Sequence, residues 1–195
     1  MRLGDYDTSN DTEIPAHEDF GAERVITHEN YRGEQAYDIA VIQLDRPVSF
    51  KSHIIPICLP ESGDSFQYQE ALVSGWGMTS NAFRPHWGKL QSLRVTVIPD
   101  ALCAGMWPRY ASAIVTIETI LCAGAYTPTE YISGTCKGDS GGPLVVTRNG
   151  RDVLIGLATG TGQECEMPEL GLFANVSTFM RWIRANTDRN EEDDY

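Results

Sequence analysis

The sequence lacks a long apolar segment and has few basic residues. No run of about 18 apolar residues occurs among its 195 residues, so we expect no membrane span. Lysine and arginine total 15 against 27 aspartates and glutamates, and the resulting net charge of −12 argues against a nucleic-acid partner. A composition with 42% hydrophobic and 22% charged residues is still that of a globular protein with a core.

Cysteine motifs for metal or redox chemistry are also absent. No two cysteines are spaced as Cys-x-x-Cys, which argues against a zinc cluster or a redox dithiol. The odd count leaves two interpretations open, namely buried free thiols or an extracellular disulfide framework with one partner missing. The first seven residues also lack the apolar stretch of a secretory signal. The five cysteines are Cys58, Cys103, Cys122, Cys136 and Cys165.

Short β-type runs dominate the chain and are separated by glycine, proline, asparagine and aspartate. Residues 93–97 alternate between apolar and polar, as a half-buried strand does. With 18 glycines and 10 prolines for turns, this pattern predicts an all-β sandwich or barrel. One helix is expected near the end, because Phe179, Trp182 and Ile183 form an apolar stripe that Ser177 can cap.

The strongest chemical signal is the run GTCKGDSGGP at residues 134–143. A hydroxyl flanked by glycines can be approached closely by a substrate backbone, and the glycines leave main-chain N–H groups free to face a developing oxyanion. A generic Gly-x-Ser-Gly is more often a plain β-turn. Six consecutive residues Gly-Asp-Ser-Gly-Gly-Pro after a cysteine are more specific, so Ser140 is a candidate nucleophile.

This run resembles the nucleophile loop of the chymotrypsin/trypsin-like serine proteases. Segments at 37–44, 56–60, 73–77 and 121–124 resemble the same family in the same order, and the acidic loop after residue 7 resembles its arthropod clip-domain members. The resemblance implies an all-β, chymotrypsin-like double β-barrel with a C-terminal helix. A single peptidase domain would then comprise a partial first barrel (1–60), a second barrel (61–176), the helix (177–187) and an acidic tail (188–195).

The resemblance implies a secreted serine endopeptidase that acts through an acyl-enzyme. Ser140 would be the nucleophile, and Asp38 the buried carboxylate that orients the general base. The main-chain N–H groups of Gly138 and Ser140 would form the oxyanion hole, and Asp139 would pair with the amine freed by zymogen cleavage. The implied disulfides are Cys103–Cys122 and Cys136–Cys165, with Cys58 left for an upstream segment.

The general base is missing from this pattern. No histidine lies next to a cysteine, as in the family's Ala-Ala-His-Cys-like segment, and we interpret all four as surface residues: His17, His28, His53 and His86. An Ile-Val-Gly-Gly-like activation terminus is absent as well. We therefore expect an N-terminally truncated chain with an incomplete first barrel, inactive as given. The alternatives are an inactive homologue that acts as a binding or regulatory cofactor in an extracellular protease cascade, and a purely structural domain.

The resemblance also implies a specificity pocket, formed by Gly134, Thr135, Thr161 and Gly171. Trypsin-like members carry an aspartate at the position of Gly134. Because this floor has no charge, a buried Arg or Lys would stay unpaired, and we expect an apolar or small residue before the scissile bond. Thr159 is expected near the triad aspartate in place of a serine. The implied partners are protein substrates, a protease-cascade partner and a serpin-like inhibitor.

Two further features lie in the acidic loop near the N-terminus. Asp5, Asp7 and Glu18 flank a segment that resembles the family's calcium loop, since hard oxygen ligands suit that ion. A solvated acidic loop is the alternative, and no other cofactor is expected. Asn10 begins an N-glycosylation sequon in the same loop, and Asn175 begins a second one that we expect to be less accessible.

Overall fold

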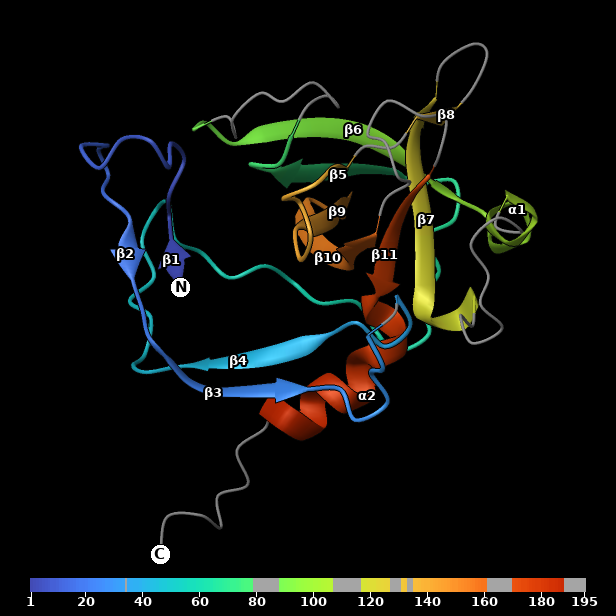
Figure 1. The fold of residues 1–195 in the computed structure, drawn as a ribbon, viewed down its shortest axis with the longest axis horizontal. Coiled ribbons are helices and arrows are strands. Elements are labelled where there is room, and N and C mark those ends of the chain that lie inside the picture. The colour runs from blue at the N-terminus through green and yellow to red at the C-terminus, as the bar shows by residue number, and fades with distance from the viewer. Residues whose placement is uncertain are drawn as a thin grey trace, which may run out of the picture.

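The structure, a computed structural model, describes residues 1–33, 35–78, 88–106, 117–126, 131–132, 135–160 and 170–187. Within these residues the regular secondary structure is mostly β-strand, arranged as one seven-stranded and two two-stranded sheets, with helix α2 (Val176–Thr187) below the larger sheet (Figure 1). None of the helices in this part combines the length and apolar character that a bilayer span requires. The predicted all-β fold class is confirmed.

The larger sheet closes into a barrel. Its strands pair antiparallel in the order β11-β10-β9-β5-β6-β7, and β11 pairs again with β7, which leaves no open edge between them. A short strand, β8 (Tyr131–Ile132), adds to β7. This closed sheet is the expected second barrel, and it has six strands. Its strands are β5 (Glu70–Gly75), β6 (Gln91–Ile98), β7 (Ile120–Tyr126), β9 (Pro143–Arg148), β10 (Arg151–Gly160) and β11 (Gly171–Asn175).

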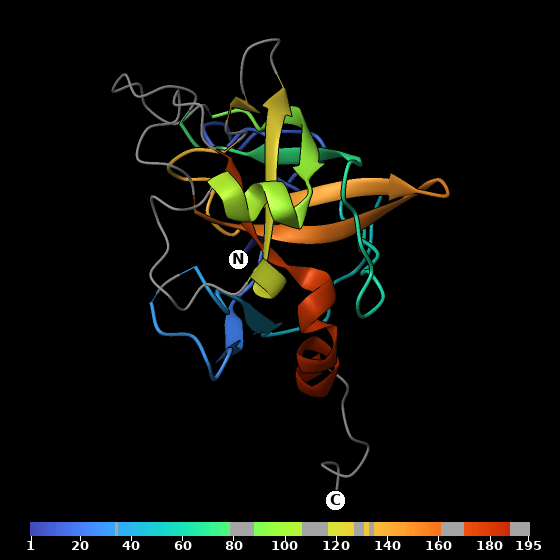
Figure 2. The ribbon, with the colours of Figure 1, turned by 90° about the vertical axis from the view of Figure 1, so that its right-hand side faces the viewer.

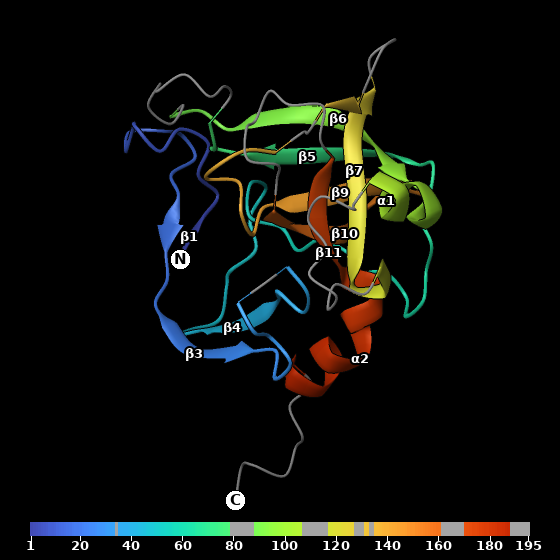
Figure 3. The same cartoon turned by 45° about the vertical axis from the view of Figure 1, so that its right-hand side comes forward.

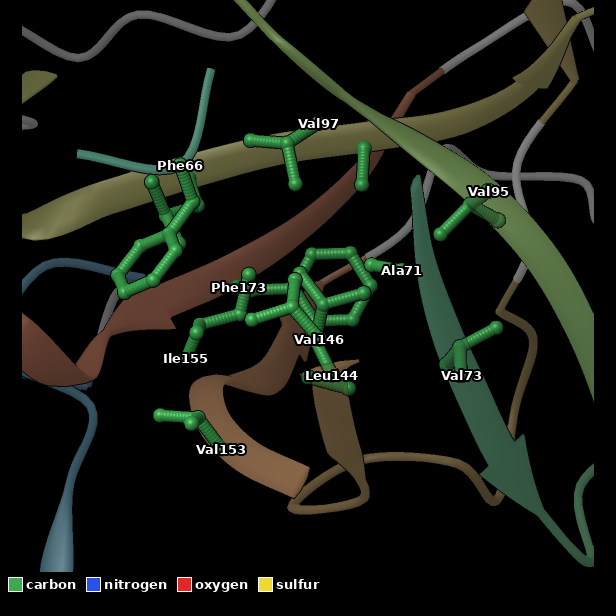
Figure 4. Close-up of a cluster of buried hydrophobic side chains, with 13 residues drawn as sticks. Phe66, Ala71, Val73, Val95, Val97, Leu144, Val146, Val153, Ile155 and Phe173 are labelled. Carbon is green, nitrogen blue, oxygen red and sulfur yellow. The ribbon is translucent and has the colours of Figure 1, made fainter. Parts of the chain in front are cut away.

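Alternating side chains fill this barrel. Along β5, Ala71 and Val73 are buried whereas Leu72 between them is exposed, because successive strand residues point to opposite faces. Figure 4 shows Val73, Leu144 and Phe173 pointing toward one another from β5, β9 and β11. The buried cluster is Phe66, Ala71, Val73, Val95, Val97, Leu121, Ala123, Leu144, Val146, Val153, Ile155, Ala158 and Phe173.

The N-terminal part does not form a closed barrel in the described residues. β1 (Arg2–Leu3) pairs only with β2 (Glu18–Asp19), and β3 (Ala22–Thr27) pairs only with β4 (Ala40–Leu44). Figure 3 shows β3 and β4 below the barrel and beside α2. The first barrel is therefore incomplete, as predicted, with two separate two-stranded sheets.

A tight turn interrupts the segment at residues 37–44 before β4 begins. Tyr37 has a φ of 58°, a left-handed conformation that a strand cannot continue through, and β4 starts only at Ala40. The main-chain N–H of Ile39 donates to the carbonyl of Tyr37 at 2.9 Å, so Asp38 lies at the tip of this tight turn. No pattern in the sequence indicates this interruption, which changes the direction of the chain at Asp38.

Helix α2 begins one residue earlier than predicted, and Ser177 is not its N-cap. Ser177 lies inside the first turn, where its buried hydroxyl donates to the carbonyl of Asp64 at 3.0 Å and to Oδ1 of Asn175 at 2.9 Å. Figure 2 shows α2 descending from the barrel. Two short helical segments, α1 (Asp100–Met106) and the 3-10 turn η1 (Ile117–Thr119), were not predicted.

Candidate active site

Ser140 is exposed at a tight turn that precedes β9. Gly138 and Gly141 have φ values of 98° and 80°, which residues with a side chain rarely adopt. The N–H of Asp139 donates to the carbonyl of Cys136 at 3.0 Å, and that of Gly142 donates to the carbonyl of Asp139 at 2.8 Å. The glycines in the motif are thus required by the backbone that presents the hydroxyl.

The carboxylate of Asp139 turns away from Ser140 into a space bounded by glycines. Its oxygens accept hydrogen bonds from the main-chain N–H groups of Gly77 and Cys136, both at 2.9 Å. A Cβ atom at Gly75 would lie 2.0 Å from Asp139 Oδ1, and one at Gly77 would lie 2.5 Å from it. The glycines near the end of β5 therefore make room for this carboxylate.

Strand β10 joins the serine turn to the segment of Asp38. Ala158 accepts a hydrogen bond from the N–H of Gly141 at 2.7 Å and donates its own N–H to the carbonyl of Gly142 at 2.8 Å. The next residue, Thr159, donates its hydroxyl to Asp38 Oδ2 at 2.5 Å. Two adjacent residues of one strand thus fix both parts of the candidate site. Thr159 lies beside Asp38, as the sequence analysis expected.

His28 is not a surface residue, which corrects the sequence interpretation. Its side chain is 8% exposed and its ring lies 5.0 Å from those of Tyr37 and Trp182 and 5.4 Å from that of Phe179, measured between centroids. Its Nδ1 accepts a hydrogen bond from the main-chain N–H of Asn30, and the main-chain N–H of His28 donates to the carbonyl of Ile39. His28 therefore packs the turn of Asp38 against helix α2.

The other histidines make contacts elsewhere. His17 Nε2 lies 4.0 Å from a carboxylate oxygen of Asp19, and His53 Nε2 lies 3.1 Å from the carbonyl oxygen of Ala16. No described histidine forms a hydrogen bond with Asp38 or Ser140. His86 lies outside the described residues.

Two of the predicted pocket residues lie together. Thr135 is buried, and a Cβ atom at Gly171 would lie 3.1 Å from its Oγ1. The other two, Gly134 and Thr161, lie outside the described residues. Among the described residues, Gln35 lies next to this region, because a Cβ atom at Gly160 would lie 3.3 Å from its Cγ. Gln35 is far from Gly160 along the chain and belongs to no motif, so no sequence pattern pointed to it.

The comparisons with known proteins agree with this geometry. The trypsin family model matches residues 1–183. The chain belongs to the trypsin family. The resemblance to the chymotrypsin/trypsin-like serine proteases is thus confirmed.

Three relatives of this trypsin-family chain are similar over nearly all of its length. It is 33% identical to the serine protease filzig of Drosophila melanogaster over 95% of the chain and 11% of filzig. It is 32% identical to vitamin K-dependent protein C of Rattus norvegicus, over 95% of the chain and 40% of that relative. It is also 32% identical to the serine proteinase stubble of Drosophila melanogaster, over 94% of the chain and 23% of stubble. The chain spans less than half the length of each relative.

The cysteines of this trypsin-family chain are partly paired as the resemblance implies. Cys103 in α1 and Cys122 in β7 form a disulfide with their Cα atoms 5.9 Å apart. Cys136 is also disulfide-bonded, and its expected partner, Cys165, lies outside the described residues. Cys58 is exposed and free.

The three carboxylates of the expected calcium loop have separate partners. Asp7 accepts hydrogen bonds from the hydroxyl and N–H of Ser9, and the hydroxyl holds the pKa of Asp7 below its ordinary value. Glu18 lies 2.5 Å from the Lys51 ammonium, which lowers the pKa of Glu18.

Asp5 is the third carboxylate of the expected calcium loop. Its side chain is 4% exposed, and its nearest cation is the Arg2 guanidinium at 3.5 Å. No group of three His, Cys, Asp or Glu side chains that could hold a metal ion occurs among the described residues. Asp5, Asp7 and Glu18 thus form no such group of three in this part of the chain, and the calcium loop stays an expectation from the sequence.

Proposed function

We propose that this chain carries the nucleophile of a secreted serine endopeptidase. The observation that carries the proposal is the anchoring of two segments on adjacent residues of β10, where Ala158 holds the turn of Ser140 and Thr159 holds Asp38. Ser140 Oγ attacks the scissile carbonyl carbon and forms an acyl-enzyme, which water then hydrolyses. Asp38 orients the imidazole that takes the hydroxyl proton.

The oxyanion of the tetrahedral intermediate is stabilised by the N–H groups of Gly138 and Ser140. Within the described residues neither N–H donates a hydrogen bond, which leaves both available to a substrate oxygen. Asp139 supports this arrangement, because its carboxylate holds the main chain at Gly77 and Cys136. Removal of one oxyanion-hole donor costs about 10²- to 10³-fold in kcat in a well-studied protease.

The general base comes from outside the described residues. A serine hydroxyl is a weak nucleophile without an adjacent base, and the described histidines bond elsewhere. We therefore propose that the 195-residue chain alone is inactive at a protease-like rate. Without the base, the rate retained from binding and the oxyanion hole is about 10³- to 10⁴-fold over water.

The substrate preference follows from the pocket. Gly134 has no charge to pair with a basic side chain, and Thr135 and Gly171 add only a hydroxyl and a hydrogen atom to the wall. An unpaired buried charge is strongly destabilising, so peptides with Phe, Leu or Ala before the scissile bond are cleaved in preference to those with Arg. Protein substrates, a protease-cascade partner and a serpin-like inhibitor are the partners proposed.

The test compares two polypeptides made in secreting cells. One is the 195-residue chain, and the other adds any coding sequence that precedes Met1 in its transcript. Both are treated with a serine-directed phosphonate and with chromogenic peptides ending in Phe, Leu, Ala or Arg. In the longer polypeptide Ser140→Ala abolishes labelling and turnover, whereas Ser92→Ala, at an exposed serine of β6, leaves both unchanged. Equal turnover by the short and the longer polypeptide would contradict the missing-base proposal.

A second candidate is an inactive homologue that binds a partner in a protease cascade. The observation that favours this second candidate is that no described histidine forms a hydrogen bond with Asp38 or Ser140. The two candidates differ in the longer polypeptide. If it does not react at Ser140 but binds a protease partner as tightly as its Ser140→Ala variant does, the inactive homologue replaces the endopeptidase.

A further inference from the structure

The two glycosylation sequons lie in different surroundings. Asn10 is exposed in the loop between β1 and β2, which Figure 1 shows at the edge of the molecule. Its N–H donates to the carbonyl of Asp7 at 2.8 Å. Ile14 in the same loop is 98% exposed, so this loop faces solvent.

The side chain of Asn10 leaves its amide nitrogen available. Its Oδ1 accepts hydrogen bonds from the N–H and the hydroxyl of Thr12 at 2.9 and 2.7 Å. Its Nδ2 makes no hydrogen bond within the described residues. The sequon is thus folded into a local turn that holds Thr12 beside Asn10, an exposed residue whose Nδ2 keeps its hydrogens free within the described part of the chain.

The second sequon is closed by tertiary contacts. Asn175 Nδ2 donates to the carbonyl of Glu118 at 3.4 Å. The hydroxyl of Ser177 is buried and donates to the carbonyl of Asp64, 113 residues away in the sequence. Asn175 also ends β11, at the junction with α2. A bulky glycan there would displace η1 or the segment of Asp64.

We propose that Asn10 is N-glycosylated and that Asn175 is not. Asn10 Nδ2 attacks the anomeric carbon of an oligosaccharide carried on a lipid diphosphate. A carbon–nitrogen bond forms, the bond from that carbon to the diphosphate oxygen breaks, Nδ2 loses one proton and the lipid diphosphate leaves. The proposal rests on the extracellular location proposed above and not on peptidase activity. The glycan would cover the acidic loop from Asp5 to Asp19.

The test uses the whole chain, secreted from mammalian cells behind a cleavable leader. Peptide-N-glycosidase removes the glycan and converts the modified asparagine to aspartate, which mass spectrometry identifies by position. Thr12→Ala removes the sequon and Thr12→Ser preserves it, so these two variants are matched at one exposed residue. Asn175→Gln is the corresponding control at the second sequon.

The expected result is one glycan per secreted chain, at Asn10. It is present in the Thr12→Ser and Asn175→Gln variants and absent from Thr12→Ala. Secreted protein with an unmodified Asn10, or with a glycan at Asn175, overturns the proposal. Ser140→Ala retains the glycan, so loss of peptidase activity and loss of glycosylation are distinguished in the same preparation.

Discussion

Replacement of Gly75 by alanine perturbs the carboxylate of Asp139 without touching Ser140. Gly75 does not have a positive φ, so its backbone accepts a side chain, and the clash arises from the carboxylate of Asp139, whose Oδ1 and Cγ would lie 2.0 and 2.9 Å from the new Cβ. We expect Gly75→Ala to lower the free energy of unfolding by about 3 kcal/mol. This combines about 1–3 kcal/mol for overpacking and about 1.5–3 kcal/mol for one lost hydrogen bond to the carboxylate.

A double-mutant cycle isolates this effect. In an Asp139→Ala background the clashing carboxylate is gone, so adding Gly75→Ala should cost about 2 kcal/mol less than it does in the unmodified chain. The expected coupling energy is about 2 kcal/mol or more. Urea unfolding followed by tryptophan fluorescence measures all four free energies, and the single variant should melt about 6–12 °C lower.

The result that refutes this reasoning is an equal cost of Gly75→Ala in the two backgrounds. That outcome would mean that Asp139 does not occupy the space beside Gly75.

Three further predictions follow from single contacts. Thr159→Val leaves an oxygen of Asp38 without its donor and should cost about 1.5–3 kcal/mol in urea unfolding, whereas Thr159→Ser should cost less. Phe173→Ala should cost about 3–5 kcal/mol, because Phe173 is fully buried in the barrel. Lys51 lowers the pKa of Glu18 from 4.5, so this pair stabilises the fold above that pH and loses its effect as the pH falls through the lowered pKa. Lys51→Met should therefore flatten the acid side of a stability–pH profile, and an unchanged profile would contradict the ion pair.

The barrel could be predicted because its signals are local. The alternation at residues 93–97 and the motif at residues 134–143 each lie within about ten residues, and the structure has strand β6 where the alternation predicted one. The stripe of α2 is equally local. Its start was misplaced because Ser177 bonds to Asp64, a residue that no sequence pattern connects with it.

The surroundings of the candidate site depend on contacts that the sequence does not display. His28 is buried because Tyr37, Phe179 and Trp182 surround it, and two of these lie more than 150 residues away. Helix α1 was missed because its seven residues are too short to show a period. The three acidic residues of the N-terminal loop resembled a metal site by composition, but the basic side chains near them could be placed only by the fold.

The bond between Thr159 and Asp38 spans 121 residues and has a consequence for timing. A chain leaves the ribosome from its N-terminus at about 5–20 residues per second, so Asp38 emerges several seconds before Thr159 is made. Contacts of such long range also form late in folding, because a large loop must close first. A nascent chain thus has no complete candidate site, and the site can form only when synthesis of the chain has nearly ended.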